Sequence, residues 1–193
     1  AYFTILTILN TDIFYNYEHA FYDSHLKSEF ENFTSHYVRF STKPFDFLNI
    51  SGGFGTGNEI AYREEIPELG DRFSFNTSVE VTLNNNLRIK PSLNLSRLKK
   101  LDSEEYFFDG YIARFDVRYQ FTSSLNLRVI SEYNEFSDQF FVQPLISWRP
   151  NADTIFYIGG NQNYIDEFVD YNSPNYRVNK SQLFLKFQYL IKS

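Results

Sequence analysis

A glycine-rich stretch is the first candidate for chemistry. Residues 51–62 read SGGFGTGNEIAY, and Gly52 and Gly57 have the spacing of the outer glycines of a phosphate-binding loop. Such a loop continues with Lys and Ser or Thr, because the ammonium contacts the phosphates and the hydroxyl binds magnesium. Asn58 and Glu59 follow here instead, and no helical pattern comes after them. A carboxylate at that place would repel phosphate, so the stretch argues against a nucleotide site.

The three histidines, His19, His25 and His36, are the next candidates. A hydrolase needs Ser and His within hydrogen-bond reach and a third group that orients the His. A zinc site needs ligands at spacings such as HxH or HExxH. Neither pattern occurs, and cysteine is absent, so there is no thiolate ligand and no disulfide framework. We therefore expect no catalytic residue, no metal site and no cofactor.

Acidic residues gather between the apolar segments, for example Asp102, Glu104 and Glu105. Carboxylate oxygens are the ligands of calcium, which keeps a calcium site open as an alternative. No run matches a known calcium loop, and solvated loop charge is the simpler interpretation.

A larger set of charged residues alternates with apolar residues along the chain. In an open pore such residues would set ion selectivity, whereas in a closed barrel they would pair across neighbouring strands and fill the interior. Both signs occur on neighbouring segments, which favours pairing. The expected lumen-facing residues are Glu80, Arg88, Lys90, Arg114, Asp116, Arg118, Arg128, Glu132 and Lys186.

The segments that carry these charges have the period of β-strands. The sequence alternates apolar and polar residues every second position, as in residues 87–96, and no helical period competes with it. Most segments have 10 to 16 residues. Strands of globular sheets average about 5 or 6, whereas a tilted strand needs roughly 9 to 11 to cross a bilayer. The eleven expected strands are 2–9, 12–22, 29–42, 46–62, 72–83, 87–100, 107–121, 124–135, 139–149, 154–164 and 179–191.

Short and long connections alternate along the chain. Short turns are expected at 10–12, 43–46, 84–86, 122–124 and 150–153, and mostly longer loops at 23–28, 63–71, 101–106, 136–138 and 165–178. This order is typical of an antiparallel up-and-down outer-membrane β-barrel, whose long loops are extracellular and whose short turns are periplasmic.

The alternation also divides the apolar and small residues between two faces. Gly53, Gly55 and Gly57 form a small-residue stripe on the face expected to line the lumen. Glycine inside a strand marks a bend or the close approach of another group, so either the wall bends there or something bulky packs against it. The residues expected to face lipid are Leu87, Leu93, Phe115, Val117, Leu185 and Phe187.

Composition is consistent with this class. Aromatic residues make up 20% of the 193 residues and favour strands, and the net charge of −6 provides no field for nucleic acid. Alternating barrel strands average to a polar composition, so the mean hydropathy of −0.40 does not argue against a membrane barrel.

Single-chain bacterial barrels usually have an even strand number. With no initiator Met and an odd count, we expect residues 1–193 to be a single barrel domain, the C-terminal part of a longer chain with 12 or more strands.

The C-terminal half carries a family resemblance. Residues 114–134 read RFDVRYQFTSSLNLRVISEYN, an Arg-rich strand that ends in Tyr-x-Phe-Thr followed by a Leu-x-Leu-Arg strand that ends in Tyr-Asn. Together with residues 155–160 and 184–190, this resembles a repeated theme of Bacteroidota outer-membrane proteins. The family is uncharacterised, and its larger members join a sugar-binding-like β-sandwich to a C-terminal barrel. The resemblance covers about residues 100–193 well and 30–100 loosely.

The resemblance implies an outer-membrane location and contact with glycans, and it transfers no catalytic residue. Members commonly end at an aromatic residue, whereas this chain continues with Ile191, Lys192 and Ser193. We expect a non-enzymatic outer-membrane barrel that acts as an anchor, scaffold or channel, with lipid and other envelope proteins as partners. The alternatives are a soluble or surface β-sheet module that binds glycans and, less favoured, an outer-membrane hydrolase.

Overall fold

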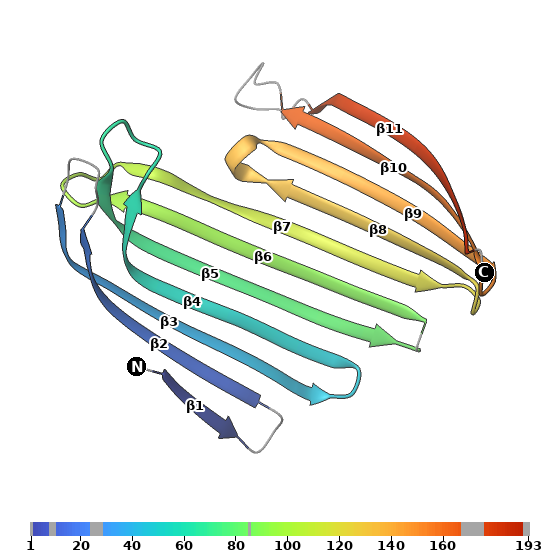
Figure 1. Ribbon diagram of the computed structural model, residues 1–193, viewed down its shortest axis with the longest axis horizontal. Helices are drawn as coiled ribbons and strands as arrows, with labels where there is room; N and C mark the ends of the chain where they lie inside the picture. The colour runs from blue at the N-terminus through green and yellow to red at the C-terminus, as the bar shows by residue number, and fades with distance from the viewer. Residues whose placement is uncertain (1, 8–10, 24–28, 85, 167–175, 191–193) are drawn as a thin grey trace. The chain divides into compact units, whose positions relative to one another are not determined.

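The computed structural model describes residues 2–7, 11–23, 29–84, 86–166 and 176–190, and the side chains of 33–84, 86–165 and 176–190. Eleven strands follow one another in a single sheet whose spatial order is the sequence order (Figure 1). The strands are β1 (Tyr2–Thr7), β2 (Thr11–Asp23), β3 (Glu29–Phe45), β4 (Leu48–Ala61), β5 (Glu68–Leu83), β6 (Leu87–Lys100), β7 (Tyr106–Gln120), β8 (Leu125–Asn134), β9 (Gln139–Asn151), β10 (Thr154–Asp166) and β11 (Tyr176–Tyr189). The predicted all-β, antiparallel, up-and-down sheet is confirmed.

Each predicted strand overlaps an observed one, and the differences lie at the ends. β5 begins at Glu68, four residues earlier than predicted, and β11 begins at Tyr176, three residues earlier. The predicted loop at 136–138 is a short 3₁₀ helix over Glu135–Ser137, followed by Asp138 in the left-handed conformation (φ 48°). Asn84 has the same kind of conformation (φ 51°) in the turn after β5, where Asn is tolerated better than most residues.

The turn predicted at residues 43–46 is misplaced. Lys43 and Pro44 belong to β3, and the chain turns at Asp46 and Phe47. The β3–β4 register shifts between Thr42 and Phe45, so two residues of β3 lie opposite one residue of β4. Proline has no N–H to donate to a strand ladder and is tolerated at such a bulge. Pro44 therefore marks an irregularity within the strand and not the end of the strand.

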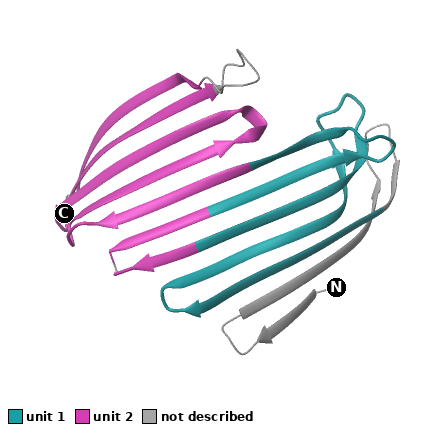
Figure 2. Ribbon diagram, turned by 180° about the vertical axis from the view of Figure 1, so that it is seen from behind, with its two compact units in different colours: residues 1–79, 92–111 teal, residues 80–91, 112–193 magenta. Residues whose placement is uncertain are grey.

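Contacts divide the sheet into two compact units (Figure 2). Unit 1 comprises residues 1–79 and 92–111, and unit 2 comprises residues 80–91 and 112–193. β5, β6 and β7 contribute residues to both units.

Few apolar side chains are buried in either unit. Among the described side chains, four hydrophobic residues are buried, namely Ile60, Ala61, Leu98 and Ile130. Twenty-four large hydrophobic residues in the same part of the chain are exposed, including Leu185, with 74% of its surface accessible. The described residues contain no helix with the length and hydropathy of a membrane-spanning segment. The described strands thus carry large apolar side chains that are not buried in a core.

Gly57 is required by the backbone of β4. Its φ of 135° lies in a region that L residues rarely adopt. A Cβ at this position would meet the carbonyl oxygen of Thr34 and approach Ser35 Cα to 2.8 Å. Both neighbouring atoms belong to the paired strand β3 and cannot rotate away. Gly57 therefore differs from the other glycines of the predicted stripe, whose neighbours are mainly side chains.

Gly57→Ala is expected to lower the free energy of unfolding by about 1–3 kcal/mol, because it forces a side chain into a sparsely populated backbone region. Urea unfolding in detergent, followed through the single tryptophan Trp148, would measure the loss. Ser51→Ala, in the same strand, is the matched control and should cost much less. Equal stability of the two variants would contradict the backbone requirement.

Candidate functional site

The candidate site of unit 2 is the side of its strands that carries the charged residues, which we call the polar face of unit 2. In the β7–β8 ladder, Arg114 lies opposite Glu132, Asp116 opposite Ile130 and Arg118 opposite Arg128. Residues two apart on a strand share a face, as do directly paired residues on neighbouring strands. These side chains therefore project from the same side of the sheet. The face is defined by Glu80, Arg88, Lys90, Arg114, Asp116, Arg118, Arg128 and Glu132.

Asp116 is the centre of an ion-pair cluster on this face. Arg118 donates from Nε to Oδ1 at 3.2 Å and from Nη2 to Oδ2 at 3.4 Å. Arg128 donates from Nη2 to the same Oδ2 at 3.1 Å across the β7–β8 ladder. One carboxylate thus holds two guanidinium groups, which would otherwise repel each other as directly paired neighbours.

Two further carboxylates on the polar face of unit 2 also pair with cations of a neighbouring strand. Glu132 accepts a hydrogen bond from Arg114 Nη1 at 3.1 Å. Glu80 contacts Arg88 Nε at 3.5 Å and Lys90 Nζ at 4.0 Å, so it is shared between two cations of β6. The expected pairing of opposite charges across strands is therefore observed for all three carboxylates.

The negatively charged side chains of this face are less exposed than the positively charged ones. The Asp116 and Glu80 side chains are 13% and 29% exposed, whereas those of Arg118 and Arg88 are 51% and 50% exposed. These carboxylates are therefore less accessible to solvent than the cations that pair with them. A solute that approaches this face meets guanidinium groups first.

The arginines border a hollow of about 410 Å³, which we call the arginine hollow. It is lined by Thr82, Asn86, Leu87, Arg88, Arg118, Tyr119, Gln120, Asn126, Leu127, Arg128 and Leu145. Arg128 Nε is buried and has no hydrogen-bond partner among the described residues. The hollow thus combines cationic donors with an apolar residue of the same face, Leu145, which pairs directly with Arg128.

Lys186, the last of the predicted lumen residues, lies on β11 directly opposite Tyr157 of β10. Its Nζ lies 5.9 Å from the centroid of the Tyr157 ring, a cation–π distance. Lys186 is therefore placed with an aromatic ring and not within the Asp116 cluster. The sequence pattern predicts on which side of the strand Lys186 lies, but it does not predict that Tyr157 is its partner.

In unit 1, the predicted glycine stripe accommodates a tyrosine. Tyr37 of β3 lies directly opposite Gly55 of β4, and Gly53 lies two residues before Gly55 on β4. A Cβ on Gly53 would collide with Tyr37 Oη and would come within 2.8 Å of Tyr37 Cζ, and a Cβ on Gly55 would meet Tyr37 Cδ2 at 3.2 Å. The sequence left a bend or a bulky neighbour as alternatives, and the structure shows the bulky neighbour. Tyr37 was not predicted as a site residue from the sequence, because no pattern in the neighbouring residues distinguishes it from the other tyrosines.

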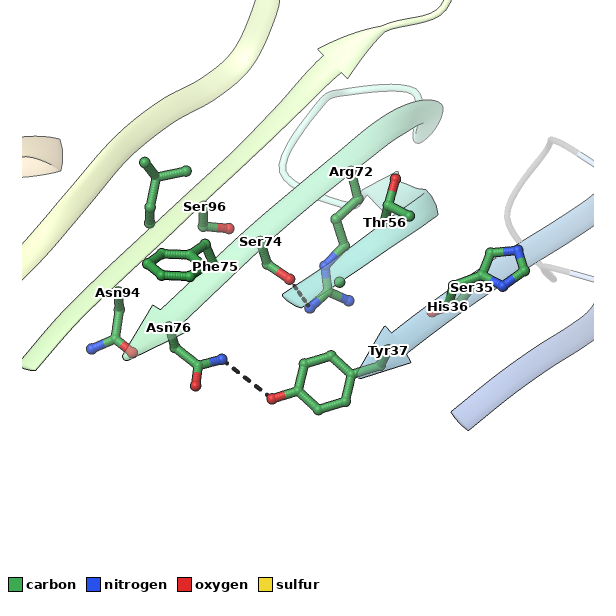
Figure 3. A pocket seen from close by; sticks show the side chains of 12 residues that line it. Ser35, His36, Tyr37, Thr56, Arg72, Ser74, Phe75, Asn76, Asn94 and Ser96 are labelled. Atoms are coloured by element: carbon green, nitrogen blue, oxygen red, sulfur yellow. Dashed lines mark hydrogen bonds between the residues drawn. The ribbon is translucent and has the colours of Figure 1, made fainter. Parts of the chain in front are cut away.

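Tyr37 also contributes to a polar hollow of about 450 Å³ in unit 1 (Figure 3). Asn76 Nδ2 donates to Tyr37 Oη at 3.2 Å, and Arg72 Nη2 contacts Ser74 Oγ at 3.5 Å (Figure 3). The only cation that lines this hollow, among the described residues, is Arg72, which is paired with Glu59 at 3.2 Å. The hollow therefore carries hydrogen-bonding groups without an excess of positive charge.

Rings cover two other glycines in the same way. On β4, Gly52 lies opposite Phe40, and a Cβ there would come within 2.7 Å of Phe40 Cε1. In unit 2, Gly159 lies opposite Phe184, and a Cβ there would come within 2.6 Å of Phe184 Cζ. An aromatic ring that lies over a cross-strand glycine compensates for the missing side chain. The recurring pattern is an aromatic residue paired directly with a glycine, which is visible only once the register is known.

The predicted lipid-facing residues alternate with those of the polar faces. Phe115, between Arg114 and Asp116, is 45% exposed, and Leu185 and Phe187 flank Lys186 and are exposed too. Leu87, Leu93 and Val117 are half-buried.

His36 lines the polar hollow of unit 1, while the side chains of His19 and His25 lie outside the described residues. No group of three or more His, Cys, Asp or Glu residues that could hold a metal ion occurs in the described part of the chain.

Comparison of the chain with known proteins gives no identification: no protein-family model matches it, and no curated protein matches it.

Truncation of the Tyr37 ring is expected to destabilise the protein more than loss of its hydroxyl. Tyr37→Ala should lower the free energy of unfolding by about 2 kcal/mol, because truncating a fully buried ring typically costs about 3–5 kcal/mol and Tyr37 is half-buried. Tyr37→Phe removes only the bond to Asn76 and should cost about 1 kcal/mol or less. Urea unfolding monitored by Trp148 fluorescence gives both values. Equal losses for the two variants would show that the ring does not support the glycines.

Asp116→Asn is expected to lower the free energy of unfolding by about 1–2 kcal/mol. It leaves two guanidinium groups side by side in a partly shielded place, a cost between that of an exposed and a buried ion pair. Asp109→Asn, which breaks the more exposed pair with Arg97 at 3.2 Å, is the matched control and should cost less. A smaller loss for Asp116→Asn than for Asp109→Asn would contradict the central role of Asp116.

Proposed function

We propose that the chain forms the wall of a transmembrane β-barrel in a bacterial outer membrane, where it acts as a non-enzymatic anchor, scaffold or channel. The observation that carries the proposal is the contrast between the two sides of the strands. In unit 2, one side holds the ion pairs and the arginine hollow, and the other holds large apolar side chains that are exposed. In a barrel, the first side lines the interior and the second contacts lipid.

The apolar side of the strands is more stable in contact with lipid than with water. Removing a Leu or Phe side chain from water is worth about 1.5–3 kcal/mol. Phe115, Leu183, Leu185 and Phe187 are all exposed in unit 2. A monomeric soluble protein rarely leaves such a patch uncovered. Outer-membrane lipid is the partner that would cover it.

Strand length supports the same proposal. From β3 onward the strands have 10 to 17 residues. A tilted strand of roughly 9–11 residues crosses the hydrocarbon region. Sequential antiparallel pairing also satisfies backbone groups without crossovers, and closure of β1 and β11, directly or through further strands, would complete the ladder that lipid requires.

Aromatic clusters lie where the strands meet the short turns. In unit 2, Tyr119 and Phe121 contact edge to face at 4.7 Å, and Trp148 stacks on Phe156 at 5.3 Å. In unit 1, Phe45 and Phe47 stack at 5.3 Å beside the β3–β4 turn. Aromatic side chains are enriched at both membrane–water interfaces. We assign the short-turn ends to the periplasmic interface and the long loops to the cell exterior.

Phe115→Arg is expected to reduce assembly into outer membranes strongly, because an arginine that faces lipid near the midplane costs about 2–4 kcal/mol. Gln143→Arg is the matched control, since Gln143 pairs with Ile130 and so lies on the polar face of unit 2. The measurement is the heat-modifiable, detergent-extracted fraction of each variant on a gel.

Normal assembly of Phe115→Arg would contradict the assignment of faces. Release of the natural protein from cells without detergent would contradict the barrel and favour a soluble glycan-binding module instead.

A further inference from the structure

The arginine hollow carries more positive charge than its carboxylates neutralise. Arg88, Arg118 and Arg128 line the hollow, and these three arginines and Lys90 share only two carboxylates, Glu80 and Asp116. The local balance is positive although the whole chain carries a net charge of −6. From this contrast we infer that the arginine hollow is a binding site for small anions and that it makes the barrel an anion-selective channel. The inference rests on the proposed function and deepens it.

The arrangement of the ion pairs leaves donors for a ligand. Each guanidinium has five N–H groups. Asp116 accepts two hydrogen bonds from Arg118 and one from Arg128. The N–H groups of Arg118 and Arg128 that Asp116 does not accept can therefore donate to another acceptor. Planar guanidinium groups suit small anions, because several N–H donors converge in one plane.

Exposure and surroundings strengthen the attraction. The Arg118 and Arg88 side chains are about half exposed, whereas Asp116, which neutralises Arg118 in part, is 13% exposed. Leu145 lines the hollow and pairs directly with Arg128 across the β8–β9 ladder, so it lies on the same face as the arginines. Apolar walls lower the local dielectric constant, so a charge pair formed there is stronger than in open water. An anion at this place would contact cations directly and carboxylates only from behind them.

The polar hollow of unit 1 does not have these properties. Its lining contains one cation among the described residues, Arg72, and Glu59 neutralises it. The remaining groups are hydroxyls, amides and Tyr37. This hollow provides an internal comparison, since it is of similar size but without excess charge.

The test is the reversal potential of the detergent-purified full chain in planar bilayers, with a KCl gradient. Near 0.1 M salt, where the Debye length is about 10 Å, chloride should permeate about threefold better than potassium in the natural protein. The double variant Arg88→Gln/Arg118→Gln removes the excess charge and should bring the permeability ratio close to one. Arg88→Glu/Arg118→Glu should reverse it in favour of potassium.

Two control variants separate charge from structure. Arg88→Lys/Arg118→Lys keeps the charge and should keep most of the selectivity. Arg97→Gln removes a cation of unit 1 that pairs with Asp109, lies over the Phe73 ring and does not line the hollow, and it should leave the ratio unchanged. Glu80 and Asp116 keep Lys90 and Arg128 as partners in the double Gln variant, so folding should persist. The heat-modifiable fraction checks this, and the single variant Arg88→Gln, with an intermediate ratio expected, replaces the double one if assembly fails.

The outcomes distinguish this inference from the proposed barrel. Inserted protein that conducts without anion preference, or whose preference survives Arg88→Gln/Arg118→Gln, overturns the anion site and leaves the barrel intact. Protein that assembles in membranes but does not conduct also overturns the inference alone. Failure of the natural chain to insert overturns the proposed function itself.

Discussion

Backbone pairing between strands that are adjacent in sequence is the constraint on which the rest of this structure depends. Each strand from β1 to β11 pairs with its sequence neighbour, and the chain forms almost no conventional apolar core in the described residues. Hydrogen bonds of the ladder must therefore supply much of the order that core packing supplies in a soluble domain. The ladder also aligns side chains across strands, so every cross-strand contact described above depends on its register.

Two kinds of cross-strand contact support this ladder. Opposite charges pair on the polar face of unit 2, where Asp116 joins β7 to β8 through Arg128. Aromatic rings lie over glycines elsewhere, as Tyr37 does over Gly53 and Gly55 and as Phe184 does over Gly159. The ion pairs neutralise charges, and the rings occupy the space over the glycines. Each contact joins neighbouring strands and does not need a shared core. The same ion pairs that stabilise the sheet also leave cations exposed, which links its stability to the proposed selectivity.

The positions of the strands could be predicted well from the sequence, and their ends less well. The alternation of residues 87–96 identified β6 from Leu87 to Lys100, because a period of two is a local property of the chain. The turn at Asp46 and Phe47 was placed too early, because Lys43-Pro44 resembles a turn when the bulge between Thr42 and Phe45 is unknown. Gly57 was grouped with Gly53 and Gly55 by spacing, yet its positive φ gives it a different role.

The sequence by itself determined the number of strands, their antiparallel order, and which residues belong to the charged and apolar sides. These properties follow from the alternation of side chains and from the lengths of the connections, both of which are visible in the sequence. Only the tertiary structure decided that Asp116 is shared by Arg118 and Arg128, that Tyr37 covers two glycines, and that Lys186 lies over Tyr157. Such partners depend on register across strands, and turns and bulges can shift register by a residue or more without changing the alternation within either strand.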